Sequence, residues 1–316
     1  MSITTAQYQM LRRDLTQVFN VAASKVVTVF DQFCTEIPSD GEFENLSWLG
    51  AMPNVREWVG PRQFNDLAGF DFIVRNKTWE SSLLFNIDKL NDGKQSGMSI
   101  QTQDQAARAV QHMQKLWFET LMANPVCYDG QNFFDTDHSA GSSGNQSNAI
   151  DVTVVDRTNP TPLEMRKALH AGLESLLSFK DDKGEPFLEL AGEPLGNLSV
   201  VCPYHIMYGP MNEAVTGALI NSGGAAVQNI LLDRPKVIPS VRVGSTFTGG
   251  DDHHFTLMYN GSVIRPFAFL KREPLKFQMK GMDDIEDNNL KAMTKARYGC
   301  GPFAWWFAVK VNLVNA

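Results

Sequence analysis

The sequence predicts an α+β fold that is organised around one long helix. From Gln101 to Pro125, apolar residues recur every three or four positions, which places them on one stripe of an α-helix. Residues 69–88 instead alternate apolar and polar side chains, the pattern of a half-buried β-strand. Residues 160–261 contain helical and strand patterns in turn, so they predict a compact α/β unit.

The long helix has start and stop signals as well as periodicity. Thr102 and Gln105 fit a capping box at its beginning, and Pro125 prevents its continuation. At about 1.5 Å per residue, such a helix is on the order of 30 Å long. Its apolar stripe consists of Ala106, Ala109, Val110, Met113, Trp117 and Leu121. A long helix with a hairpin leading into it is typical of a spine rather than of a catalytic scaffold.

The segments before this helix are predicted to be arm-like. Residues 5–34 form an amphipathic helix or helix pair, whose apolar stripe needs a partner in the same subunit or in a neighbour. Residues 38–60 lack a regular period and form an irregular arm. Residues 69–88 are expected to form a β-hairpin that turns at residues 75–78. Because two strands alone are marginal in water, this hairpin must lie on another surface.

The segments after the long helix are ordinary mixed structure. Thr161 and Glu164 form a capping box, with Pro162 at the first helical position, so a second helix begins there. The remaining predicted elements are a buried strand at 198–202, a helix at 204–220, strands at 226–232, 236–243 and 254–259, a strand-like segment at 263–279 that Pro274 interrupts, and one apolar strand within 296–314.

Composition argues against several classes of function. The chain has 316 residues and a formal net charge of −7, so as a whole it is not an electrostatic nucleic-acid binder. Residues 262–316 contain nine Lys/Arg and five Asp/Glu, a net of +4, which leaves −11 for the remainder. We interpret the basic end as a solvated face, with contact to a polyanion as the alternative. We expect no signal peptide, no membrane-spanning segment, and reduced cysteines in a cytosolic setting, because the four cysteines form no CxxC pair.

Possible catalytic or metal-binding clusters are weak. Asp135, Asp137 and His138 are suitable metal ligands, and a metal-dependent hydrolase that uses them is the alternative enzyme hypothesis. An ordered loop held by carboxylate hydrogen bonds is the simpler interpretation of this segment. We expect His253 and His254 to lie in an exposed turn and His112 to face solvent. No catalytic residue, cofactor or metal is therefore predicted.

Three blocks of sequence, in order, resemble the major head subunit of Mu-like phages and prophages. They are Trp48-Leu49-Gly50 with Pro53, Arg56-Glu57-Trp58-Val59-Gly60 and Arg62; Asn76-Lys77-Thr78 with Glu80; and Cys127-Tyr128-Asp129-Gly130-Gln131-Asn132-Phe133-Phe134-Asp135 with His138. The last block is the most specific, because it is long and unusual in composition. Together the blocks cover roughly residues 48–148, about a third of the chain.

This resemblance implies the Hong Kong 97-type capsid fold. In that fold an N-terminal arm and an extended β-hairpin, the E-loop, accompany a peripheral domain with a long spine helix and an α/β axial domain. The implied division is 1–50 for the arm, 51–95 for the E-loop, 96–159 with 262–316 for the peripheral domain, and 160–261 for the axial domain. The hairpin then lies over a neighbouring subunit, which gives it the partner that it needs.

The resemblance also implies a function. It is that of a major capsid protein, which assembles as pentamers and hexamers into the icosahedral head of a tailed phage and encloses double-stranded DNA. Scaffold, portal and possibly decoration proteins are the implied partners, without a membrane, and assembly takes place in the host cytoplasm. An accessory virion protein, such as a decoration or tail component, is the other alternative.

Residues at the subunit interface are predicted on the projecting segment, where charged and aromatic side chains occur together. They are Arg56, Glu57, Trp58, Arg62, Trp79 and Glu80. The variant Trp79→Ala is therefore expected to fold as a monomer but to assemble poorly.

Overall fold

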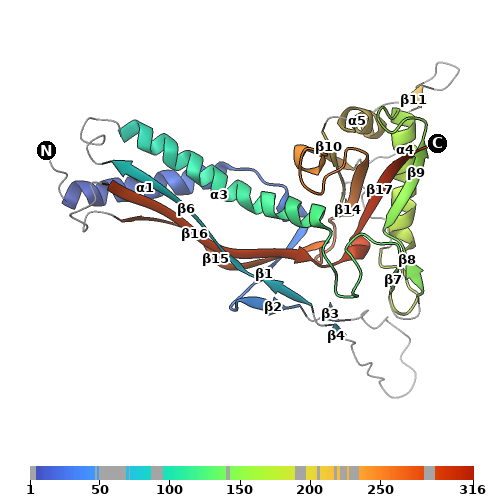
Figure 1. Ribbon diagram of the computed structural model, residues 1–316, viewed down its shortest axis with the longest axis horizontal. Coiled ribbons are helices and arrows are strands. Elements are labelled where there is room, and N and C mark those ends of the chain that lie inside the picture. Colours follow the sequence, from blue (N-terminus) through green and yellow to red (C-terminus); the bar gives the residue numbers. More distant parts are fainter. Residues whose placement is uncertain are drawn as a thin grey trace.

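The chain folds into an elongated lobe and a compact lobe that meet end to end (Figure 1). The computed structural model describes residues 5–46, 48–49, 69–70, 72–86, 95–139, 143–188, 197–204, 207–216, 219–220, 226–227, 235–280 and 289–316. The N-terminus lies at the far end of the elongated lobe, and the C-terminus lies in the compact lobe. No helix in the described segments is both long enough and apolar enough to cross a membrane.

The elongated lobe consists of two helices that run along a four-stranded sheet. The helices are α1 (Thr5–Lys25) and α3 (Gln95–Ala123). The sheet has the order β1-β15-β16-β6, and its strands are β1 (Cys34–Pro38), β15 (Phe267–Lys280), β16 (Asn289–Pro302) and β6 (Lys77–Asn86). β1 is parallel to β15, whereas the β15–β16 and β16–β6 pairs are antiparallel.

The compact lobe contains a five-stranded mixed sheet in the order β13-β10-β14-β17-β9. Its strands are β13 (Lys236–Ser240), β10 (Leu198–Pro203), β14 (His254–Tyr259), β17 (Ala308–Asn315) and β9 (Ala149–Val154). Helix α4 (Pro162–Ser178) packs on this sheet, and α5 (Tyr208–Thr216) packs on α4. Gly172 of α4 lies so close to β17 that an added Cβ would be 3.0 Å from a methyl group of Val311.

Short elements connect these layers. The 3₁₀ turns are η1 (Phe30–Gln32), η3 (Val241–Val243) and η4 (Trp305–Phe307). The two-stranded ribbons are β2 (Phe43–Asn45) with β5 (Ile73–Arg75), β3 (Trp48–Leu49) with β4 (Gly69–Phe70), β7 (His138–Ser139) with β8 (Asn145–Gln146), and β11 (Leu219–Ile220) with β12 (Ala226–Val227).

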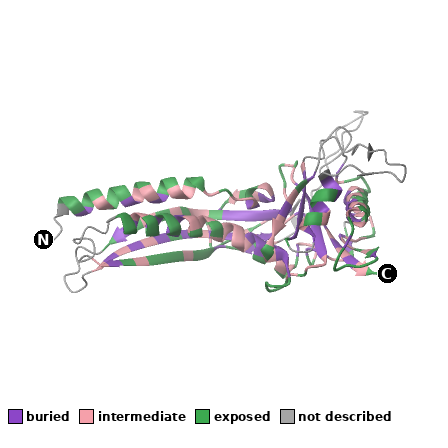
Figure 2. Cartoon of the chain, turned by 90° about the horizontal axis from the view of Figure 1, so that it is seen from above, coloured by how far each residue is buried: buried purple, intermediate pink, exposed green. Residues whose placement is uncertain are grey.

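The described residues form two separate hydrophobic cores. The larger core fills the compact lobe and continues through the lobe junction to Trp117 of α3 and Phe267 of β15. The smaller one lies at the far end of the elongated lobe, where Leu15 of α1, Met98 of α3 and Phe85 of β6 pack together. The elongated lobe is therefore held at both ends by apolar contacts, and buried, intermediate and exposed residues are mixed along its strands (Figure 2).

The prediction of the long helix is confirmed, but its predicted start is wrong. α3 begins at Gln95, so Thr102 and Gln105 lie inside the helix, and both are buried. Gln105 Nε2 donates a hydrogen bond to the Ser81 carbonyl of β6 at 2.9 Å, so its side chain ties the helix to the sheet instead of capping it. The helix ends as predicted before Pro125, with Asn124 in the left-handed region at φ 46°. The predicted capping box of Thr161 and Glu164 is confirmed.

The predicted hairpin within residues 69–88 is wrong. β6 is a strand with the predicted alternation, but its partner is β16, with which it forms ten residue pairs without a register shift. β5 pairs with β2 instead. The long antiparallel pairing with β16 satisfies more backbone groups than a short hairpin could, so the distant partner prevails.

The prediction of one closing strand within residues 296–314 is also wrong. β16 ends at Pro302 and β17 begins at Ala308, and these two strands belong to different sheets. The 3₁₀ turn η4 between them carries the chain from the elongated lobe to the compact lobe. In β15, Pro274 does not end the strand, because it lies at a register shift between Glu273 and Lys276 where the ladder is already interrupted.

Candidate assembly surface

Trp79 lies inside the elongated lobe rather than on a projecting element. It is half-buried on the face of β6 that meets α3, and its ring centroid is 4.3 Å from that of His112. Its Nε1 donates a hydrogen bond to the Tyr298 carbonyl of β16 at 3.1 Å. His112 Nδ1 and the Tyr298 hydroxyl are 2.7 Å apart, so the three rings form one connected cluster.

The expectation that His112 faces solvent is therefore wrong. Burial lowers the pKa of His112, and the nearby Lys115 lowers it further, against an opposing effect of Glu119. A pocket of about 210 Å³ opens beside this cluster, with Leu275 of β15 and Arg108 of α3 also on its wall. This volume is sufficient for one side chain, so the pocket is a place where a neighbouring molecule can insert a residue.

Glu80 differs from Trp79 because it points to the opposite face of the sheet. It is exposed and lies directly across from Lys295 of β16. The other four predicted interface residues, Arg56, Glu57, Trp58 and Arg62, lie outside the described residues. The structure thus brings Trp79 and Glu80 onto one strand but onto different surfaces.

Two glycines allow the β2–β5 ribbon to cross the sheet. An added Cβ at Gly299 of β16 would lie 2.2 Å from the Arg75 carbonyl oxygen, and one at Gly301 would lie 2.7 Å from a Val74 methyl group. β5 therefore crosses β16 in direct backbone contact, on the face opposite α3. No local sequence pattern reveals the role of Gly299 and Gly301, because it depends on a contact between residues more than 200 positions apart.

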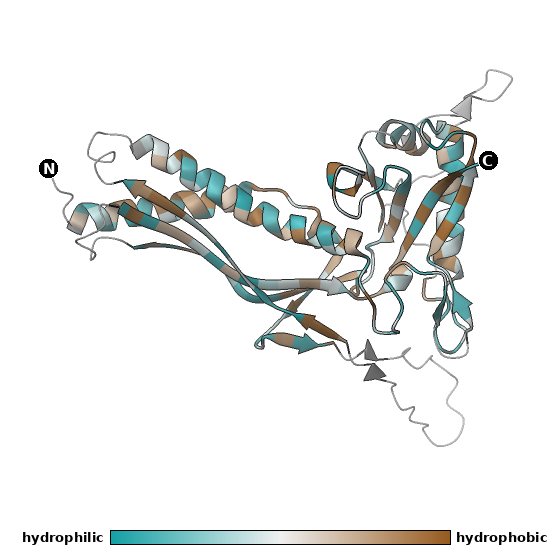
Figure 3. Cartoon of the chain, viewed as in Figure 1, coloured by the Kyte–Doolittle hydropathy of each residue, from teal (hydrophilic) through white to brown (hydrophobic). Residues whose placement is uncertain are grey.

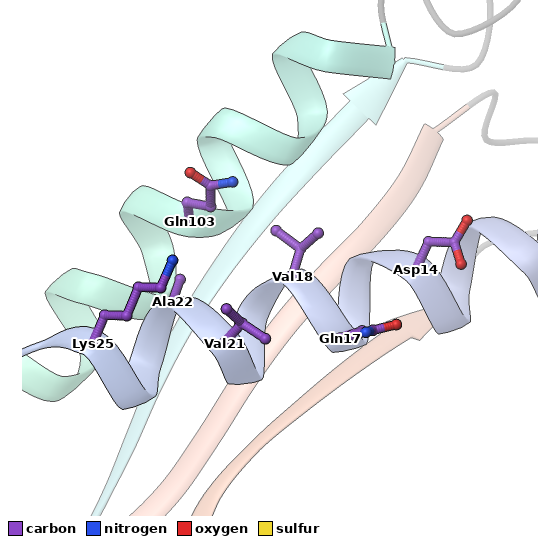
Figure 4. Close-up of a pocket in the computed structure, with 7 residues that line it drawn as sticks. All are labelled: Asp14, Gln17, Val18, Val21, Ala22, Lys25 and Gln103. Atoms are coloured by element: carbon purple, nitrogen blue, oxygen red, sulfur yellow. The ribbon is translucent and has the colours of Figure 1, made fainter.

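The groove between the two helices is a second apolar surface. α1 buries Tyr8, Leu15 and Phe19 toward the sheet, whereas Val21 on its other side is 46% exposed. A hollow of about 360 Å³ lies along this side, with Gln103 of α3 at its edge. Figure 4 shows Val18, Val21 and Ala22 along α1 in this hollow, between Asp14 and Lys25.

The segment with the strongest family resemblance forms the joint between the lobes. His138 Nδ1 lies 2.6 Å from Asp129 Oδ2, and both side chains are almost completely buried. The His138 ring stacks on Trp305 of η4, with centroids 4.1 Å apart. Asn148 Nδ2 donates hydrogen bonds to the carbonyls of Phe133 and Trp305. These contacts fix the loop against the turn through which the chain passes between lobes.

This geometry does not favour the hydrolase alternative. His138 is occupied by Asp129 and the Phe133 carbonyl. Asp135 accepts from the backbone N–H groups of Asn132 and Thr136, and Asp137 accepts from the side-chain amide of Gln131. Within the described segments, no three His, Cys, Asp or Glu side chains converge as metal ligands. The expectation of an exposed turn is wrong for His254, which is buried at the start of β14.

Comparison with known proteins now identifies the architecture. The full-length fold is similar to the capsid of cyanophage P-SCSP1u, with a TM-score of 0.58, 11% identity, and coverage of 92% of this chain and 89% of that one. It is also similar to the procapsid of bacteriophage JBD30, with a TM-score of 0.57, 20% identity, and coverage of 98% and 76%. This is the Hong Kong 97-type capsid fold.

Sequence comparison supports the same assignment over the first half of the chain. Residues 8–162 match the model of the Mu-like prophage major head subunit gpT. The FluMu prophage major head subunit of Haemophilus influenzae is 27% identical over 137 residues, which are 43% of this chain and 44% of that protein. The major capsid protein of Escherichia phage Mu is 26% identical over 160 residues, 48% of this chain and 52% of that protein. The matches thus span about half the length of these relatives, and the resemblance seen in the sequence is confirmed.

Proposed function

We propose that this chain is a major capsid protein, which self-assembles into the icosahedral head shell of a tailed double-stranded DNA phage or prophage. The observation that carries the proposal is the capsid fold over the whole chain, combined with the match of residues 8–162 to the Mu-like head subunit. The form of the elongated lobe supports it. Among the described residues, helices cover one face of its sheet, and on the other face the β2–β5 ribbon crosses only one end, which leaves the remainder for neighbours (Figure 3).

The mechanism is mechanical rather than chemical. Shell assembly needs many modest contacts between identical subunits, which symmetry closes into pentamers, hexamers and finally a shell. The groove of α1, the pocket beside Trp79 and the open sheet face each offer such a contact. On this proposal residues 1–50 act as the arm, 51–95 as the E-loop, 96–159 with 262–316 as the peripheral domain, and 160–261 as the axial domain. Of the strands in the peripheral ranges, β17 pairs with β14 and β9 pairs with β17 in the compact lobe, so both join the sheet of the axial range. Arg56, Glu57, Trp58, Arg62, Trp79 and Glu80 contribute to the interfaces.

Partners and location follow from the same role. Scaffold, portal and decoration proteins act with the shell, and assembly occurs in the host cytoplasm before the protein becomes part of the virion. The shell encloses DNA without sequence-specific binding, and charge attraction to the DNA is small, since the chain has a formal net charge of −7. The protein performs no enzymatic step in this scheme.

The experiment is negative-stain electron microscopy of the purified protein, together with its sedimentation profile. The chain is expressed alone and together with its neighbouring genes. We expect uniform shells or capsomer rings. A small monodisperse species under both conditions would overturn the proposal. In purified phage particles the chain should also be the most abundant protein, and a low copy number would assign it to an accessory component instead.

A further inference from the structure

The open face of the elongated sheet carries an unusual arrangement of like charges. Lys276 of β15 lies directly opposite Lys295 of β16, and Lys280 lies directly opposite Lys291. Their neighbours Phe277 and Met279 point to the helix side, so all four lysines share the face that points away from α1 and α3. Like charges directly opposite each other destabilise an antiparallel pair. This unfavourable pairing of lysines occurs twice on one face.

The described carboxylates on this face are too few to neutralise it. Glu273 contacts Lys295 at 3.4 Å and Arg297 at 3.6 Å. Partial burial raises the pKa of Glu273, but Lys295, Arg297 and Lys276 outweigh it and lower the pKa overall. Glu273 thus serves three cations, Glu80 lies across from Lys295, and Glu44 of the ribbon that crosses this face interacts with Arg272, so the outer part of the strands carries the excess of positive charge. We call Lys276, Lys280, Lys291, Lys295 and Arg297 the cationic face.

The sequence between β15 and β16 is acidic. Its residues 283–287 lie outside the described residues. Lys276 is four residues from the end of β15 and Lys295 is six from the start of β16. At about 3.3 Å per residue, these are separations of roughly 13 and 20 Å, which exceed a Debye length of about 8 Å at physiological salt. Lys276 and Lys295 therefore lie well inside their strands, with Lys295 paired with Glu273 and Lys276 in no ion pair among the described residues.

A rigid acidic turn on the same protein is the complementary surface. Asp40 and Glu42 lie in the turn between β1 and β2, and both are exposed. Residues 26–55 contain five acidic residues and no Lys, Arg or His. Two nearby acids are engaged within the chain, since Glu36 pairs with Lys271 and Glu44 accepts from Ser39 and from the N–H groups of Asp40 and Gly41. Among the described residues, the carboxylates of Asp40 and Glu42 form no ion pair.

The turn is also held in a defined shape. Asn76 Nδ2 donates to Ser39 Oγ at 2.6 Å and to the Gly41 carbonyl at 3.0 Å. A Cβ at Gly41 would lie 2.8 Å from the Phe43 carbonyl oxygen, so glycine permits this tight turn. A preorganised acidic turn can bind a cationic surface without a large loss of conformational entropy.

We propose that the cationic face of one copy, centred on Lys276 and Lys295, binds the Asp40–Glu42 turn of a second copy. The inference rests on the proposed shell function. The two surfaces are different parts of the chain, so the contact can repeat head-to-tail from copy to copy, and such a contact forms a ring where the rotation between copies closes. A ring of this kind matches a capsomer. The rest of the chain has a formal charge of −11 outside residues 262–316, which opposes the binding of DNA to this face and favours a protein partner.

The test is a charge exchange. One variant carries Lys276→Glu with Lys295→Glu, a second carries Asp40→Lys with Glu42→Lys, and a third combines all four substitutions. The control carries Lys167→Glu with Lys180→Glu, two exposed lysines of the compact lobe. Circular dichroism and thermal unfolding establish that each variant is folded, and sedimentation with electron microscopy measures particle yield.

We expect each double variant to lose at least about tenfold in particle yield, the combined variant to recover most of it, and the control to assemble like the wild type. Wild-type yield from both double variants would overturn the inference while leaving the shell function intact. Folded double variants without recovery in the combined variant would overturn the assignment of Asp40 and Glu42. Normal shells with reduced DNA content would assign the cationic face to DNA instead. Absence of particles from the wild type would count against the shell function itself.

Discussion

The two lobes differ in how far their sheets are buried within the chain. In the compact lobe, β10 and β14 are buried at every residue, so both faces of the sheet are covered within the chain. In the elongated lobe, buried and accessible residues alternate along most of β16, and β15 does so in its outer half. Among the described residues, the central strands of the compact lobe are therefore covered within the chain, whereas much of one face of the elongated sheet is left for other molecules. Substitutions in the first should change folding stability, and substitutions on the open face of the second should change association.

The largest expected effect lies at the joint between the lobes. Trp305 is fully buried and contacts His138, Phe179 and Phe187. Trp305→Ala should lower the free energy of unfolding by about 3–5 kcal/mol, because it removes these contacts and leaves a cavity. Chemical denaturation of a non-assembling preparation measures this loss. A loss below about 1 kcal/mol would show that the lobes do not depend on this joint.

The second-largest effect is expected from acid, which should destabilise the compact lobe. His254 is 1% exposed, and burial together with Lys310 lowers its pKa to about 4, although Asp251 opposes the shift. In the unfolded chain the group takes up a proton below about pH 6.5, whereas in the folded chain it stays neutral until about pH 4. Its contribution to stability is thus complete above pH 6.5 and is lost as the pH falls toward 4, by at most about 3 kcal/mol.

The measurement is the free energy of unfolding of the wild type and of His254→Asn between pH 7 and pH 4. The variant should show a shallower decrease over this range, while His170→Asn, a change at an exposed position, should follow the wild-type slope. Equal slopes in the wild type and His254→Asn would assign the acid sensitivity of the compact lobe to groups other than His254.

A smaller effect is expected where the ribbon crosses the elongated sheet. In Gly299→Ala, the new methyl group would meet the backbone oxygen of Arg75, which cannot rotate away, so the variant should lose about 1–3 kcal/mol. Gly97→Ala is the matched control, because nothing lies within 4 Å of its added Cβ inside α3. That variant should gain about 0.5–1 kcal/mol. Hydrogen exchange at residues 73–75 should accelerate in Gly299→Ala alone, and unchanged exchange there would refute the close crossing.

The difference between local and distant contacts explains which features the sequence could predict. The spine helix, the alternation of β6 and the capping box at Thr161 depend on neighbours within a few residues, and these features were recovered. The partner of β6 lies about 200 residues away, and no local window contains it. The 3₁₀ turn at Trp305 is apolar throughout, so it resembled the strands on either side of it. His138 was noted as a possible metal ligand, but it pairs with Asp129 of the same loop and stacks on Trp305, a partner too distant in the sequence for a local pattern to show.

The smallest effect on stability is expected at Glu80, where a substitution tests the predicted interface most directly. Trp79→Ala cannot test that interface cleanly, because the Trp79 ring packs against His112 and bonds Tyr298 within the chain. Glu80 is exposed and faces Lys295 across the strands. Glu80→Gln should change the free energy of unfolding by no more than about 0.5 kcal/mol, the usual range for a surface substitution.

Assembly then decides the role of Glu80. If Glu80 contributes to a contact between subunits on the open face, Glu80→Gln should shift the salt concentration at which particles dissociate. The thermal midpoint of the isolated subunit should stay unchanged. Glu119→Gln on α3 provides the comparison, since it removes an exposed negative charge from the helix side of the same lobe. Equal shifts in both variants would reflect net charge alone. A shift confined to Glu80→Gln would place the contact on the sheet face, where the elongated lobe lacks a cover of its own.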